Sequence, residues 1–333
     1  MFGSAERRQR RANRMLWTWF GVLMVLILVV LVLLLLPLAE RGDRHPVEGS
    51  ADWMARLDDG LPLNRIVLPG THDSATQYVQ LAFFSKCQGL SVGEQLEAGY
   101  RYLDIRLGED ESGKALMLMH GFTKCKTGFG PKSAPLYLED VLGECFAFLV
   151  QHPGETVLFC VKHEYGDMDD AAFAALLDEY LQNNPERWLL TDSIPTLGEA
   201  RGKLVLLRRY EADAGLPLLW ENQSGSEDTG LNTAANPNGA YTLYVQDRYE
   251  YDLDQKWSAF RAGMDNGAGV GDISLNFLST KGSFAYGHPY FFARTLNQRL
   301  QALPLRPEAF PGWIVVDFGG APLARHIYEV NFA

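Results

Sequence analysis

Cysteine is scarce in this chain of 333 residues, which contains four of them. No two are separated by the C-x-x-C spacing typical of zinc sites, so the sequence argues against a structural zinc centre. Cys87 and Cys125 fall in loop-like sequence rich in glycine and lysine, and they are the pair that we expect to form a bridge in an oxidising compartment. Cys145 lies in an apolar helical pattern and Cys160 in a strand-like run, so we expect these two to be buried free thiols.

Positive charge is in deficit as well. Lys and Arg number 30 against 41 Asp and Glu, which gives a net charge of −11. The first 14 residues contribute +4, so the rest of the chain carries −15. Nucleic-acid affinity comes largely from cationic contacts to phosphates, and this composition therefore argues against a nucleic-acid partner. If the domain handles a phosphate, a few local cations in a pocket must hold it.

Long hydrophobic runs are absent after residue 39, but one precedes it. Residues 15–39 contain no charge and, at about 1.5 Å per residue, would span a hydrocarbon core roughly 30 Å thick. The basic segment 1–14 places the N-terminus in the cytoplasm and the remainder outside it, periplasmic or extracellular. A cleaved signal peptide is the alternative, but the run is too long and Pro37 stands where a small residue is needed. We therefore predict a single-pass membrane protein with an uncleaved signal-anchor helix.

No repeat, low-complexity tract or second linker follows the anchor. Residues 40–52 form a short polar linker, and we predict that residues 53–333 are one domain. Short apolar runs alternate in it with segments of helical periodicity, and one such segment begins with Ser91 and Glu94 at capping-box spacing.

The alternation predicts an α/β fold, a TIM-like (β/α)8 barrel. The connection 107–114 is only eight residues long, fewer than a parallel crossover usually takes, so we expect the barrel to be irregular. The eight predicted strands are 66–68, 102–106, 115–119, 156–161, 204–207, 241–246, 273–277 and 312–316.

Ionisable side chains follow these runs. The stretch "VLPGTHDSATQY" (67–78) places His72 and Asp73 after the first run, and its Pro69-Gly70 pair predicts a turn before them. Active sites of such barrels lie at the carboxyl ends of the strands, where side chains from different strands meet. Because strands commonly end where polarity begins, the pattern is supporting and not decisive by itself. The other residues are Asp104, Arg106, His120, Lys162, Arg208, Arg209, Asp247 and Asp317.

These residue types fit one kind of chemistry. Two histidines with carboxylates to orient them can divide the roles of general base and general acid. Arg106, Lys162 and Arg209 supply positive charge for a phosphate and donors for hydroxyl groups. The set therefore favours a phosphodiester that carries a polyol.

Seven motifs, in this order, resemble those of the bacterial phosphatidylinositol-specific phospholipase C family, whose catalytic region is the PI-PLC X domain. The resemblance covers roughly residues 53–320, and the order of the motifs makes it more specific than any one of them. The motifs are "IVLPGTHDSAT", "YRYLDIRL", "MLMHG", "VKHEYGDM", "LGEARGKLVLLRRY", "YTLYVQDRYEY" and "GWIVVDF".

The resemblance implies a role for each site residue. His72, oriented by Asp317, would take the proton from the inositol 2-hydroxyl, which would attack the adjacent phosphorus and form a cyclic phosphate. His120, supported by Asp73, would protonate the departing diacylglycerol oxygen. Charge on the phosphoryl oxygens would be stabilised by Arg106, beside which Asp104 shapes the site. The positions that match the family's inositol-binding residues are Lys162, Arg209, Asp247 and Tyr249.

The same resemblance predicts that no metal or other cofactor is needed. Calcium-dependent relatives carry acidic ligands in this part of the site, and a fixed cation such as Arg106 would repel a divalent ion there. The expected partner is phosphatidylinositol in a bilayer, and no protein partner is indicated.

Several alternatives stay open. Lys162 and Arg209 are also compatible with ordinary charges at strand ends, and Tyr249 with packing. The aromatic residues Phe83, Phe84, Phe284 and Tyr286 suit either packing or the membrane interface. The competing functions are a metal-dependent, glycerophosphodiesterase-like enzyme and a non-catalytic lipid-binding module.

Overall fold

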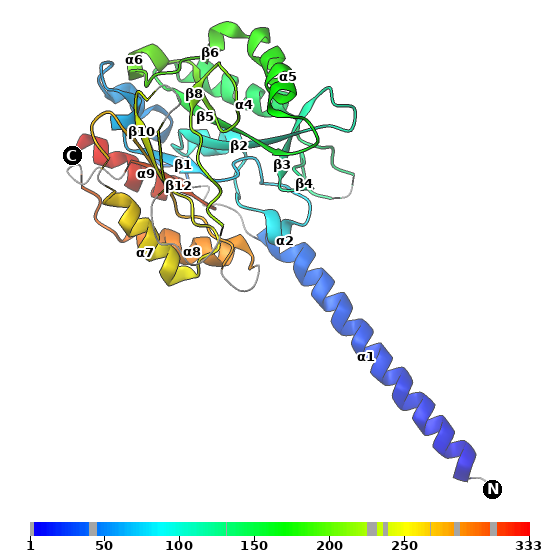
Figure 1. The fold of residues 1–333 in the computed structure, drawn as a ribbon. Helices are drawn as coiled ribbons and strands as arrows, with labels where there is room; N and C mark the ends of the chain where they lie inside the picture. The colour runs from blue at the N-terminus through cyan, green and yellow to red at the C-terminus, as the bar shows by residue number, and fades with distance from the viewer. Residues whose placement is uncertain are drawn as a thin grey trace. The chain divides into compact units, whose positions relative to one another are not determined.

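The computed structural model describes residues 3–39, 45–130, 132–224, 232–235, 239–266, 268–282, 287–306 and 312–333. The chain divides into two compact units, Met1–Glu40 and Arg41–Ala333 (Figure 1). The first consists of helix α1 (Gly3–Ala39), in which Glu6–Leu36 is long and apolar enough to cross a membrane. That finding rests on length and composition, and a signal sequence near an N-terminus has the same properties.

The second unit is built on one curled, mainly parallel sheet, which confirms the predicted α/β barrel-like fold. Neighbouring strands follow the order β6-β7-β5-β2-β1-β12-β11-β10-β9, and β9 is antiparallel to β10. The principal parallel strands are β1 (Leu68–Thr71), β2 (Tyr102–Glu109), β5 (Val157–Tyr165), β7 (Leu204–Arg208), β10 (Thr242–Gln246), β11 (Ile273–Phe277) and β12 (Trp313–Val316). The other strands of this order are the two-residue β6 (Trp188–Leu189) and the antiparallel β9 (Asn232–Ala235), and the two-residue β8 (Leu216–Pro217) pairs with β7.

The prediction that residues 115–119 form a parallel strand of the barrel is wrong. Residues Leu116–His120 form β3, which pairs antiparallel with β2 as a hairpin and continues into β4 (Thr123–Lys124). Strand β5 therefore lies directly beside β2. Residues 107–109 of the short connection extend β2, and residues 110–115 form the hairpin turn, which needs no crossover helix.

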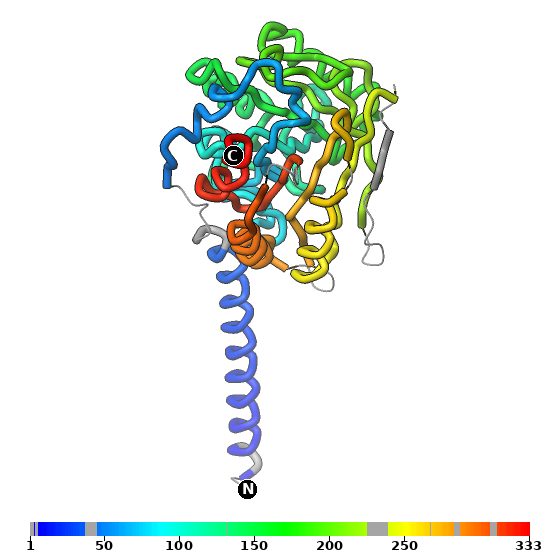
Figure 2. Tube along the Cα trace, turned by 90° about the vertical axis from the view of Figure 1, so that its left-hand side faces the viewer, coloured from blue at the N-terminus to red at the C-terminus, as the bar shows by residue number. Residues whose placement is uncertain are grey.

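Helices cover the outside of the sheet. Figure 1 shows α4 and α5 on one side and α7 and α8 on another, and α7 and α8 lie side by side (Figure 2). The predicted capping box is confirmed, because Ser91 and Glu94 satisfy each other's backbone N–H groups at the start of α3. The helices are α2 (Ala82–Ser85), α3 (Val92–Glu97), α4 (Leu138–Gln151), α5 (Asp170–Asn183), α6 (Leu197–Ala200), α7 (Leu253–Met264), α8 (Pro289–Gln301) and α9 (Ala321–Tyr328).

Alternation along the strands decides which side chains enter the barrel. On β2 and β5, Tyr102 and Cys160 belong to one core cluster, whereas Ile105 and Phe159 belong to another that includes Phe173 of α5. Successive side chains of a strand point to opposite faces. Side chains in phase with Tyr102 and Cys160 therefore point away from α5, into the barrel. These include Asp104, Arg106, Lys162 and Glu164.

Two smaller expectations are also corrected. All four cysteines are buried free thiols, so Cys87 and Cys125 are not bridged, while Cys145 and Cys160 are as predicted. The Sγ of Cys87 lies near the imidazole of His120 instead. The Pro69-Gly70 pair lies within β1 and not in a turn. A Cβ at Gly70 would stand 2.9 Å from Tyr102, so the glycine permits the close approach of β1 to β2.

Candidate active site

A cavity of about 480 Å³ opens at the carboxyl ends of the barrel strands. Eight of the ten predicted site residues line it, and the other two, Asp73 and Asp104, are buried directly behind. The structure therefore brings all ten together. The eight that line the cavity are His72, Arg106, His120, Lys162, Arg209, Asp247, Tyr249 and Asp317.

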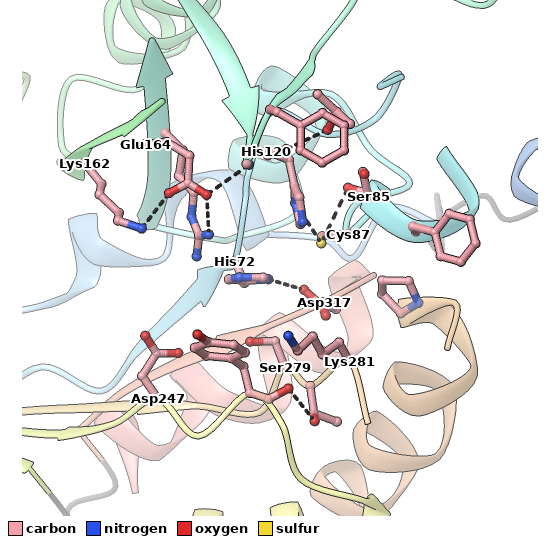
Figure 3. A pocket seen from close by; sticks show the side chains of 18 of the residues that line it. His72, Ser85, Cys87, His120, Lys162, Glu164, Asp247, Ser279, Lys281 and Asp317 are labelled. Atoms are coloured by element: carbon pink, nitrogen blue, oxygen red, sulfur yellow. Dashed lines mark hydrogen bonds and ion pairs between the residues drawn. The ribbon is translucent and has the colours of Figure 1, made fainter. Parts of the chain in front are cut away.

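The pairing of β1 with β12 brings His72 to Asp317. Thr71 is in register with Val316, so the next residue of each strand lies at the same edge. The His72 Nδ1 is 2.8 Å from the Asp317 Oδ1 (Figure 3). Burial and Arg106 act to lower the pKa of His72, but the carboxylates of Asp317 and Asp73 together outweigh them, so that pKa is raised above its ordinary value. With Nδ1 held by Asp317, the Nε2 of His72 is the atom left to accept a proton.

Asp73 connects the two imidazoles. Its Oδ2 lies 2.8 Å from the Nδ1 of His120 and 3.5 Å from the Nε2 of His72. Asp73 has a φ of 45°, in the left-handed region, and its backbone N–H donates to the Oδ2 of Asp104. Burial acts to raise the pKa of Asp73, but Arg106 and the imidazoles lower it to about 2. The residue is therefore a carboxylate at any ordinary pH.

Arg106 lies among three carboxylates. Its guanidinium is 3.0 Å from Asp104 and 3.3 Å from both Asp73 and Glu164. Burial acts to lower the pKa of Arg106, but these carboxylates, Asp104 foremost, raise it well above its ordinary value. These contacts fix the cation beside Asp73, and it lines the cavity.

Two functional positions were not identified from the sequence. Glu164 binds the Lys162 Nζ at 2.5 Å and accepts a hydrogen bond from the Gly121 N–H, which ties the residue after β3 to β5. The buried Gln88 donates to the carbonyls of His72 and Val316, which holds the ends of β1 and β12 together. Strand alternation from Lys162 was a signal for Glu164, but the sequence offers none for Gln88.

The polar end of the cavity is formed by the remaining predicted residues. The Arg209 guanidinium stacks 3.4 Å above the Trp220 ring and lies 3.9 Å from the Asp247 carboxylate. The Trp220 indole N–H donates to the same Asp247 oxygen at 3.2 Å. Tyr249 lines this end too. Cations, carboxylates and an aromatic face together suit a ligand with several hydroxyl groups.

The mouth of the cavity is apolar. Leu81, Phe84 and Phe122 line it, and all three are exposed. Phe83 instead stacks on the buried His288, a packing role. Phe284 and Tyr286 lie outside the described residues.

A metal ion is a poor fit to this site. Within the described residues, His72, Asp73 and Cys87 place ligand atoms within 4.8 Å of one another. The Arg106 Nη1, however, is 3.3 Å from the same Asp73 carboxylate and would repel a divalent cation. One imidazole, one carboxylate and one thiol are also not the oxygen set that calcium prefers.

Comparison with known proteins shows which family this chain resembles. Residues 62–210 match the family profile described as phosphatidylinositol-specific phospholipase C, X domain. The 1-phosphatidylinositol phosphodiesterase of Staphylococcus aureus (strain Newman) is 28% identical over 295 residues, which cover 81% of this chain and 88% of the relative. The Listeria monocytogenes protein of the same name is 29% identical, covering 86% and 87%. The solved structure of a double mutant of the phosphatidylinositol-specific phospholipase C from S. aureus superposes with a TM-score of 0.68 at 25% identity, covering 84% of this chain and 97% of that one.

Proposed function

The chain carries a PI-PLC X domain and is related along most of its length to bacterial phosphatidylinositol-specific phospholipases C, and we propose that it cleaves phosphatidylinositol. In our proposal the products are diacylglycerol and inositol 1,2-cyclic phosphate, and no metal takes part. The observation that carries the proposal is the arrangement of two histidine–carboxylate pairs around one fixed arginine.

The reaction begins with the inositol 2-hydroxyl. The Nε2 of His72 takes its proton, and the oxygen forms a new bond to the neighbouring phosphorus. Asp317 keeps the Nδ1 proton of His72 in place and stabilises the imidazolium that results. The Arg106 guanidinium neutralises charge that develops on the phosphoryl oxygens.

The glycerol oxygen then leaves. The bond between phosphorus and this oxygen breaks, and the protonated Nε2 of His120 delivers the proton that makes it a hydroxyl. Asp73 holds the Nδ1 of His120, so the Nε2 is the atom left to deliver the proton. His72 has gained one proton and His120 has lost one, and exchange with water restores both.

Substrate binding divides along the cavity. We assign the inositol ring to Lys162, Arg209, Asp247 and Tyr249, and the lipid to the apolar mouth at Leu81, Phe84 and Phe122. We further propose that α1 remains attached as a membrane anchor, with the N-terminus cytoplasmic and the catalytic domain outside the cytoplasm.

The experiment uses the full chain with phosphatidylinositol vesicles, in EDTA, and follows release of diacylglycerol. We expect release in EDTA and its loss in the His72→Ala variant. Loss of activity in EDTA that calcium restores would favour the metal-dependent diesterase. Lipid binding without release, in wild type and variant alike, would favour a non-catalytic lipid-binding module.

A further inference from the structure

A buried lysine lies behind the polar end of the cavity, and the mechanism above gives it no role. Lys256, on α7, has no exposed surface. Its Nζ donates to the Oε1 of Gln246 at 2.9 Å and to the backbone carbonyl of Arg248 at 2.8 Å. Burying an amino group is costly unless its hydrogen bonds are satisfied, so packing alone does not account for a lysine at this position.

The two acceptors bracket Asp247. Gln246 is the last residue of β10, and its Oε1 also accepts from the Arg248 N–H at 2.9 Å. Its Nε2 donates to Asn276 and Phe277 on β11, at 2.8 and 2.6 Å. The turn that follows β10 is therefore fixed to α7 through Lys256 and to β11 through Gln246.

This turn presents the side chains of the polar end. Asp247 meets Arg209 and Trp220, as described above. Tyr249 follows two residues later and lines the cavity, and its carbonyl accepts from the Thr280 hydroxyl at 3.1 Å. A change in the turn would move both Asp247 and Tyr249 while leaving the two histidines on their own strands.

The contacts of Lys256 do not require its charge. Burial lowers the pKa of Lys256 to about 7, with Arg248 adding to the fall and with Asp247 and Asp317 opposing it. These three are the charged groups that act on it, from the ends of β10 and β12. A neutral amine still donates two hydrogen bonds, so both contacts persist on either side of that pKa.

We propose that Lys256 is a positioning residue for substrate recognition, because its amino group fixes the turn that carries Asp247 and Tyr249 to the inositol end of the site. It touches no reacting atom. The inference rests on the proposed function, since it assigns Lys256 to the binding half of that same site.

The test is Lys256→Met in the full chain, assayed on phosphatidylinositol in mixed detergent micelles and by inhibition with free inositol. We expect the KM and the inositol inhibition constant each to rise about fivefold or more, with kcat within about threefold of wild type. Lys203→Met is the matched control, because the Lys203 ammonium donates to the Glu199 carbonyl ahead of β7 and Lys203 does not line the described cavity. It should change neither constant.

A folded Lys256→Met variant with wild-type KM and inositol inhibition overturns the proposal, as does a fall in kcat alone. If circular dichroism shows that this variant does not fold, Lys256→Gln replaces it, since an amide can still donate. That variant should show a smaller rise in both constants, and wild-type values would overturn the proposal equally. A wild type that binds inositol but cleaves nothing refutes the proposed function separately, and inositol affinities measured by NMR then decide the role of Lys256.

Discussion

Asp73 is the residue on which both halves of the proposed reaction converge. One carboxylate oxygen faces both imidazoles and the Arg106 guanidinium. Its left-handed backbone is held by Asp104, which is fully buried and bonded to Arg106 as well. Asp73 therefore contacts the proposed base His72, the proposed acid His120 and Arg106. Asp104 holds Asp73 and Arg106 in place.

Asp317→Asn should change the pH dependence of the reaction. The Asp317 carboxylate is the main group that raises the pKa of His72, with Asp73 adding to the rise, and His72 must be neutral to act as a base. Activity should thus fall as the pH decreases through that raised pKa. Without the Asp317 carboxylate, the pKa of His72 should fall, and the acidic limb of kcat/KM should move to lower pH. The maximal rate should also be reduced by about 10²-fold or more. Asp178→Asn on α5 is the control, and an unmoved acidic limb in Asp317→Asn would contradict the assignment.

Arg106→Lys should preserve the charge but lose most of the activity. The planar guanidinium reaches Asp104, Asp73 and Glu164 at once, which a single ammonium cannot do. We expect kcat on phosphatidylinositol to fall by about 10²-fold, in EDTA and with added calcium alike. A variant within threefold of wild type, or one that calcium rescues, would count against the role given to Arg106.

At the scale of elements, the sequence predicted the strands better than their connections. Seven of the eight predicted runs overlap parallel strands, because each run is largely apolar and most residues of these strands are buried. The first run, 66–68, meets β1 only at Leu68. The run that became β3 is just as apolar, and only its short connection to β2 distinguished it. Apolar composition records burial but not strand direction, which is why the hairpin was not assigned.

Site residues at the ends of strands could also be predicted better than those that reach the site from loops and helices. Residues that end a strand, such as His72 and Asp317, could be placed because β1 and β12 are neighbours in any closed arrangement. Gln88 and Lys256 could not, because they reach the strand ends from a loop and from the outer helix α7. Their positions depend on tertiary packing, which no local pattern records.

Arg101 ties the start of the domain to the barrel. It is fully buried, pairs with Glu155 at 2.8 Å, and donates to the carbonyls of Ser50 and Ala51 in the short helix Ser50–Asp52. Residues 50–52 of the predicted linker therefore pack against the barrel.

Arg101→Met should destabilise the full chain by about 3–5 kcal/mol, because it leaves the Glu155 carboxylate buried and unpaired. Chemical unfolding in detergent measures this, and adding Glu155→Leu should recover part of the loss. A double variant less stable than the single one would contradict the explanation.

On the scale of the whole molecule, an apolar helix and an acidic catalytic unit are joined in one chain. An uncleaved anchor predicts that the mature protein keeps residues 1–39 and stays in the membrane pellet after alkaline washing. Intact-mass measurement of the purified protein provides the check. A soluble product that begins after residue 39 would establish a cleaved signal peptide instead.

The central claim is phosphotransfer within the substrate, carried out by paired imidazoles and an arginine. Phosphorus NMR of the products formed by the full chain from phosphatidylinositol in EDTA tests it most directly. We predict that a cyclic inositol phosphate appears first, together with diacylglycerol, and that His72→Ala forms neither. An acyclic inositol phosphate as the first product, or no product until a divalent metal is added, would contradict the account.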